Sequence, residues 1–64
     1  MNNSLKELKK LLYKYSYGGI APRDVDYVNG VILFYDLKIH FDNSFESLLK
    51  VIGKLEEVLN ASDI

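Results

Sequence analysis

The chain has 64 residues, no cysteine, one histidine and a formal net charge of −1 at pH 7. A chain this short forms one domain, here residues 1–64, and buries only about 60% of the surface that its unfolded form exposes. The composition excludes disulfides and leaves few ligands for a structural metal. Association with another chain is therefore the remaining common source of extra stability.

No segment of the sequence is suited to entering a membrane. The longest apolar run covers residues 31–35, far below the about 20 residues of a transmembrane helix. The N-terminal residues lack the apolar stretch and cleavage site of a signal peptide, and the absence of cysteine fits a reducing compartment. We expect a soluble cytoplasmic protein with no membrane partner.

The first predicted element is a helix over residues 5–16. Ser4 and Glu7 have the spacing of a capping box, in which each side chain accepts a backbone N–H at the helix start. Gly18 and Gly19 supply the positive-φ positions at which helices end. Apolar residues repeat at helical spacing on one face, namely Leu5, Leu8, Leu11, Leu12 and Tyr15.

The second predicted element is an antiparallel hairpin over residues 24–41. Pro22 cannot donate a hydrogen bond to a sheet, so it belongs to the connection before the hairpin. Asn29-Gly30, between two apolar runs, is the strongest short-range signal of a two-residue hairpin turn, because both residues accept positive φ. The second strand is the longer of the two.

The apolar pattern of the predicted hairpin changes face near Tyr35 and Asp36. With a two-residue turn, one face holds Val25, Tyr27, Ile32 and Phe34. Period 2 places the next apolar residues on the opposite face, namely Leu37, Ile39 and Phe41. Either a bulge restores the register, or both faces are covered, one by helices and one by a partner.

The last predicted element is a helix over residues 44–59, with Asn43 and Glu46 at capping-box spacing. Gly53 costs about 0.5–1 kcal/mol relative to alanine inside a helix, which indicates close packing at this position. The order of helix, hairpin and helix predicts a small α+β fold of αββα type, with the hairpin packed by the N- and C-terminal helices.

The last helix also predicts self-association. At 100° per residue its apolar side chains cover an arc of about 180°, which is more than a two-stranded sheet can shelter. We therefore expect a homodimer formed through this helix. The predicted self-association residues are Leu48, Val51, Leu55 and Val58.

The polar face of the first helix combines lysines with tyrosines. The predicted partner-binding residues are Lys6, Lys10, Tyr13, Lys14 and Tyr17. Such a face is either a solvated lysine surface or a site where lysines neutralise charge and tyrosines stack on or contact a partner. The single arginine argues against reading DNA bases, for which bidentate arginine contacts are the commonest device.

The remaining polar residues predict no enzyme, metal site or cofactor. Asp24, Asp26, Asp36 and Asp42 surround the predicted hairpin, where charged residues prevent strands from pairing with other sheets. Asp24 and Asp26 lack the glycine and distal glutamate of a calcium loop. His40 has no candidate nucleophile or second metal ligand beside it, so we expect a surface residue.

These observations favour a small non-enzymatic module that binds another protein as an inhibitor or regulator. The alternative is a nucleic-acid-binding regulator that uses the lysine and tyrosine face. Residue types with A/T-rich codons (Phe, Ile, Asn, Lys and Tyr) make up 25 positions, which fits an A/T-rich bacterium or its phage and suggests a phage or mobile-element origin.

Overall fold

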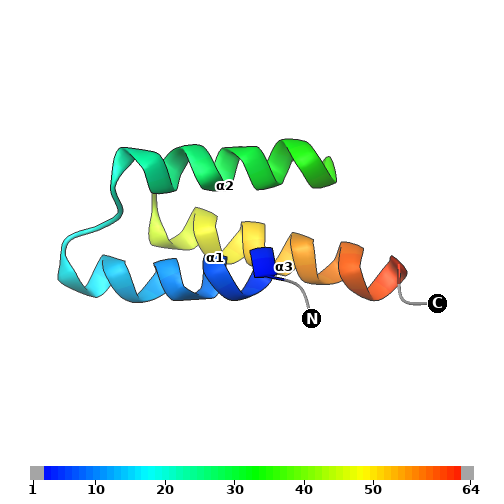
Figure 1. The fold of residues 1–64 in the computed structure, drawn as a ribbon, viewed down its shortest axis with the longest axis horizontal. Coiled ribbons are helices and arrows are strands. Elements are labelled where there is room, and N and C mark those ends of the chain that lie inside the picture. Colours follow the sequence, from blue (N-terminus) through cyan, green and yellow to red (C-terminus); the bar gives the residue numbers. More distant parts are fainter. Residues whose placement is uncertain (1–2, 63–64) are drawn as a thin grey trace.

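The computed structural model describes residues 3–62, and within that range the chain forms helices and no strand. Helix α1 spans Asn3–Lys14 and continues into a short 3-10 turn, η1, at Tyr15–Tyr17. Helix α2 spans Pro22–Tyr35, and α3 spans Phe45–Ser62. Figure 1 shows the three helices lying along the long axis of the molecule, with α1 running opposite to α2.

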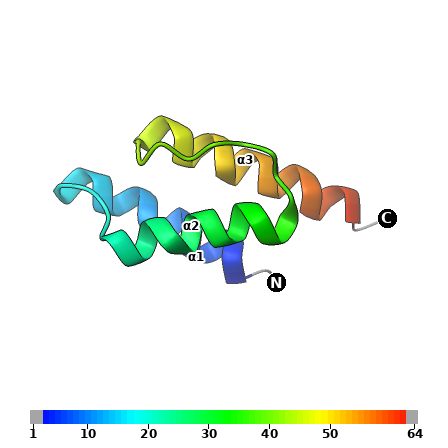
Figure 2. The ribbon, with the colours of Figure 1, turned by 90° about the horizontal axis from the view of Figure 1, so that it is seen from above.

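The predicted α+β fold is therefore wrong, because the residues assigned to the hairpin form α2 and an extended segment, residues 36–44. Figure 2 shows this segment returning along the molecule before α3 begins, so α2 and α3 run in the same direction. Asn29 and Gly30, the predicted turn, lie in the middle of α2. In this fold the helical spacing of the apolar residues outweighed the turn signal.

Local features explain where α2 begins and ends. Pro22 occupies the first helical position, where its missing N–H costs nothing, and the Asp24 carboxylate accepts the Ala21 N–H at 3.2 Å. At the other end Asp36 is left-handed, with φ 52°. The Asp36 N–H donates to the Leu33 carbonyl and the Leu37 N–H donates to the Ile32 carbonyl, which is the Schellman motif. The change of apolar face predicted near residues 35 and 36 is thus the end of a helix.

The core is a single cluster to which all three helices and the extended segment contribute. Leu37 and Phe41 are buried, while Lys38 and His40 between them are exposed. The alternation that predicted a strand therefore describes an irregular strap over the core, since Lys38 within it has a left-handed φ of 58° and the described residues 3–62 form no strand. The buried apolar residues are Leu8, Leu11, Val28, Val31, Ile32, Leu37, Phe41, Leu48, Val51, Ile52 and Leu55.

The capping box of α3 lies one residue later than predicted. The Ser44 hydroxyl accepts the Ser47 N–H at 3.1 Å, and the Ser47 hydroxyl accepts the Ser44 N–H at 3.3 Å. Asp42 accepts both the N–H and the hydroxyl of Ser44. Asn43 instead has a φ of 62° and receives a hydrogen bond from η1, so it is not the cap.

The close packing predicted at Gly53 is also absent. A Cβ built at Gly53 or at Gly30 meets no atom within 4 Å. Packing within the described part of the chain therefore does not explain either helical glycine.

Candidate protein-binding groove

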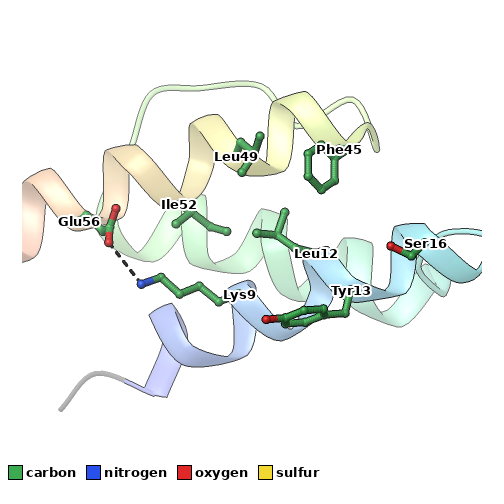
Figure 3. Close-up of a pocket in the computed structure, with 8 residues that line it drawn as sticks. All are labelled: Lys9, Leu12, Tyr13, Ser16, Phe45, Leu49, Ile52 and Glu56. Carbon is green, nitrogen blue, oxygen red and sulfur yellow. Dashed lines mark ion pairs between the residues drawn. The ribbon is translucent and has the colours of Figure 1, made fainter.

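A groove of about 620 Å³ runs between α1 and α3. Figure 3 shows Leu12 and Ile52 between the two helices, with Phe45 and Leu49 on the α3 side and Tyr13 on the α1 side. We call this feature the binding groove. Its lining residues are Lys9, Leu12, Tyr13, Ser16, Phe45, Leu49, Ile52 and Glu56.

The walls of the binding groove are apolar and open to solvent. Ile52 forms part of the core and is buried at the floor. Tyr13 is 73% exposed, Phe45 is 45% exposed and Leu49 is 44% exposed. Folding buries more than half of Phe45 and Leu49 but little of Tyr13, and the exposed remainder of all three would become buried if another apolar surface lay against it.

One end of the groove is bounded by an ion pair between Lys9 and Glu56, with Nζ 3.4 Å from the carboxylate oxygen. Figure 3 shows the pair crossing from α1 to α3. Both side chains are about half exposed, and pairs of this kind contribute about 0.2–1 kcal/mol. The pair therefore closes this end of the groove only weakly.

The other end is fixed by Tyr15. Its hydroxyl donates a hydrogen bond to the Asn43 Oδ1 at 3.2 Å, and its ring meets Phe45 edge to face at a centroid distance of 6.1 Å. Burial, and then the charge of Asp42, raises the pKa of the Tyr15 phenol above 10.0. These contacts hold η1 against the start of α3 and orient Phe45 in the groove wall.

The structure separates the predicted partner-binding residues into two groups. Lys6, Tyr13 and Tyr17 are exposed, and Tyr17 is 90% exposed. Lys10 forms an ion pair with Glu7 at 3.5 Å, and Lys14 forms one with Asp24 at 3.0 Å. Of the five predicted residues, Tyr13 lines the binding groove.

Three of the four predicted self-association residues lie inside the chain's own core. Leu48, Val51 and Leu55 have no exposed surface, and Val58 is partly buried. The reason is that α1 packs along α3, with α2 and the strap adding to the cover, and together they shelter the arc that a two-stranded sheet could not have covered. These three side chains pack inside the single chain and present no surface to solvent.

Sequence reasoning did not single out most of the groove. Its α3 wall consists of residues at the edge of the apolar arc, Phe45 and Leu49, four residues apart. Their position at the edge of the arc could have indicated that they stay exposed, because residues at the centre of an apolar arc are buried first. Which edge stays open depends on where α2 packs.

The described residues contain no group of three or more His, Cys, Asp or Glu side chains placed to hold a metal ion. His40 is exposed. Within residues 3–62, no helix has both the length and the apolar character needed to span a membrane. Comparisons with protein-family models, with curated proteins and with solved structures found no match to this chain.

Proposed function

We propose that this chain is a small non-enzymatic protein-interaction module that acts in the cytoplasm as an inhibitor or regulator. Its binding groove receives the apolar face of a helix from a partner protein. The observation that carries the proposal is the row of large side chains between α1 and α3 that keep 44–73% of their surface exposed, namely Tyr13, Phe45 and Leu49.

The shape of the groove favours a helix as the bound element. Its two walls are themselves helices, so an amphipathic helix laid between them would complete a packed layer, as in other helix-in-groove complexes. Apolar residues of the bound helix at i, i+3 or i+4, and i+7 would contact Phe45, Leu49 and Ile52 one after another. These three residues of α3 have matching spacings of four and three.

The charge beside the groove favours an acidic partner. Helix α1 carries lysines at positions 6, 9, 10 and 14 and one acidic residue, Glu7. Lys6 and Lys10 lie on the exposed side of this helix. Lys9, Lys10 and Lys14 already form exposed ion pairs within the chain, so an acidic edge on the bound helix would exchange with these pairs and would set its orientation more than its affinity.

The experiment is affinity capture from a lysate with the immobilised full chain, compared with a Leu49→Glu variant. Leu49 is 44% exposed, so the substitution places a charge in the groove wall without emptying the core. We expect the variant to lose the captured protein. Leu33→Glu on α2 is the matched control and should retain it. Equal capture by both variants would contradict the proposal.

The second candidate is a nucleic-acid-binding regulator, and the exposure of Tyr13 and Tyr17 beside Lys6 and Lys10 favours it. Binding to phosphates weakens steeply between about 50 and 200 mM salt because counterions are released. Capture that disappears after nuclease treatment and in a Lys10→Glu, Lys14→Glu variant would support this candidate over the groove.

A further inference from the structure

The binding groove lies on the side of the α1–α3 pair that faces away from α2. Figure 3 shows α2 behind the two helices that line the groove. These two helices run antiparallel, since Lys9 contacts Glu56 near one end and Tyr15 contacts Phe45 near the other. The groove side is therefore an open layer of two antiparallel helices, which is the form of one half of a four-helix bundle.

The charges on this open layer are divided between its two helices. The charged residues that line the groove are Lys9 on α1 and Glu56 on α3. Lys6 lies one turn before Lys9, and Glu46 lies one turn before Leu49, so both extend the same layer. Lys6 and Glu46 are exposed. The layer thus presents lysines on the α1 side and glutamates on the α3 side.

The other charges of the two helices lie at the edge of this layer or behind it. Lys10 pairs with Glu7, and Lys14 pairs with Asp24 of α2. Glu7 lines a separate cavity next to α2. Winding α3 at 100° per residue places its remaining charged residues about 80–140° away from Leu49, namely Lys50, Lys54 and Glu57.

We propose that the open layer binds a second copy of the chain face to face, so that α1 of each copy lies over α3 of the other. The four helices then form a bundle in which every neighbouring pair is antiparallel. The inference rests on the proposed function, because the second copy covers the same groove and has to leave before a partner helix binds. Self-association would therefore regulate access to the groove.

Charge decides between the two ways in which two such layers can be stacked. A two-fold axis across the helices would place α1 on α1 and α3 on α3, so lysines would face lysines and glutamates would face glutamates. A two-fold axis along the helices places Lys6 and Lys9 of each copy over the acidic side of α3 of the other. The interface is isologous, as in most homodimers, and opposite charges meet twice.

The axis along the helices also fixes which residues meet. Rotation about such an axis leaves every residue at its own height along the bundle. Lys9 contacts Glu56 within one chain, so Lys9 also lies level with Glu56 of the second copy, and the exposed ion pair becomes part of a group of four charges. Tyr13, four residues after Lys9, lies level with the turn of α3 that contains Leu49 and Gly53.

This arrangement explains the glycine inside α3. Gly53 follows Leu49 by four residues and therefore shares its side of the helix. A Cβ at Gly53 meets no atom within 4 Å, and Tyr13 is 73% exposed. The Tyr13 ring of the second copy can pack on the backbone at Gly53, and this contact offsets the cost of a helical glycine.

Sedimentation equilibrium of the full chain tests the proposal. Leu49→Glu should raise the dimer dissociation constant by about tenfold or more, and Lys6→Glu by about fivefold or more, because like charges then meet twice. Lys54→Glu, on the far side of α3, and Leu33→Glu, on α2, are the matched controls and should leave it unchanged. A chain that stays monomeric up to about 1 mM, or a dimer unaffected by Leu49→Glu, would overturn the proposal.

Gly53→Ala separates the dimer from the stability of the single chain. The added methyl group meets empty space within one chain, so the monomer should stay folded while the dimer weakens. Gly30→Ala on α2 is the control and should leave the dimer unchanged. A Gly53→Ala dimer as tight as that of the parent would contradict the contact between Tyr13 and Gly53.

Cross-linking tests the axis, because the chain has no cysteine of its own. A mixture of Tyr13→Cys chains and Leu49→Cys chains should be linked into heterodimers by a short bifunctional thiol reagent, and each variant alone should be linked far less. Efficient linking of Tyr13→Cys to itself would overturn the stacking of α1 over α3.

The two proposals on this groove can fail separately. A monomeric chain whose capture of a protein from lysate still depends on Leu49 would remove the dimer and leave the proposed function standing. A dimer that depends on Leu49, in a chain that captures no protein even when dilute, would support the dimer and remove the proposed function.

Discussion

Lys14 at the end of α1 and Asp24 in the first turn of α2 form an ion pair, with Nζ 3.0 Å from the carboxylate oxygen. The same carboxylate oxygen accepts the backbone N–H of Ala21. One side chain thus closes the first turn of α2 and joins that turn to the preceding helix. The contact between the end of α1 and the start of α2 therefore includes a titratable group.

The first prediction concerns pH. The hydrogen bond from Lys14, followed by that from Ala21, lowers the pKa of Asp24 below its ordinary value of 3.8. Because the folded state holds the proton less tightly than the unfolded state, this stabilisation is complete above about pH 3.8 and is lost as the pH falls through the folded pKa. Thermal unfolding of Asp24→Asn should show a lower melting temperature than the parent chain near neutral pH.

That difference between Asp24→Asn and the parent should shrink as the pH falls through the folded pKa of Asp24, because the native carboxyl then becomes neutral as well. Asp26→Asn, on the exposed side of the same helix, is the control and should change the melting temperature little. A difference for Asp24→Asn that stays constant over the whole pH range would show that the charge is not the cause.

The second prediction concerns the start of α3. Ser44→Ala removes the acceptor of the Ser47 N–H and the donor to Asp42. Loss of such a cap should reduce the free energy of unfolding by about 0.5–2 kcal/mol, measured by urea denaturation. Ser16→Ala, an exposed serine beyond α1, should have an effect within about 0.5 kcal/mol. Equal effects would argue against the capping role.

The third prediction concerns the helical glycines. Gly53→Ala should raise the free energy of unfolding by about 0.5–1 kcal/mol, since alanine restricts the unfolded chain and the added methyl group meets empty space. The measurement is urea denaturation at a concentration where the chain is monomeric. A lower free energy of unfolding for Gly53→Ala would contradict the open space that the structure shows at this position.

The fourth prediction compares a buried leucine of α3 with an exposed leucine of α2. Leu48 has no exposed surface, so Leu48→Ala should cost about 2–5 kcal/mol. A core this small rarely supplies more than about 3–5 kcal/mol, so the variant should be largely unfolded by circular dichroism. Leu33→Ala, from an 81% exposed position, should remain folded. Similar losses in both variants would contradict the observed placement of α2.

The sequence predicted helices at both ends of the chain because the apolar periodicity there is helical. The start signals were less accurate, since α1 begins at Asn3 and contains Ser4, and the cap of α3 is Ser44 and not Asn43.

The prediction failed for α2 because Val25, Val28 and Ile32 satisfy helical spacing while the β-branched and aromatic residues around Asn29-Gly30 favour a hairpin. Apolar residues on both sides of α2 also weaken the helical periodicity of its sequence. Longer-range packing decided between the two structures.

The candidate site could be predicted only in part. The lysines and tyrosines on the outer side of α1 followed from its periodicity, and Tyr13 is among them. The groove itself could not be predicted, because it exists where α2 and the strap leave one edge of α3 uncovered. The burial of Leu48 and Leu55 has the same origin, since a third helix shelters more surface than a hairpin.

The strap has a consequence for engineering the chain. Connections between helices usually accept inserted residues, and the exposed residues around Gly18 offer such a place. Between Leu37 and Phe41, however, one added residue would turn a polar side chain inward and push an apolar one into water. A tag or fluorescent label is best inserted in the connection between α1 and α2. The strap between α2 and α3 should be left at its present length.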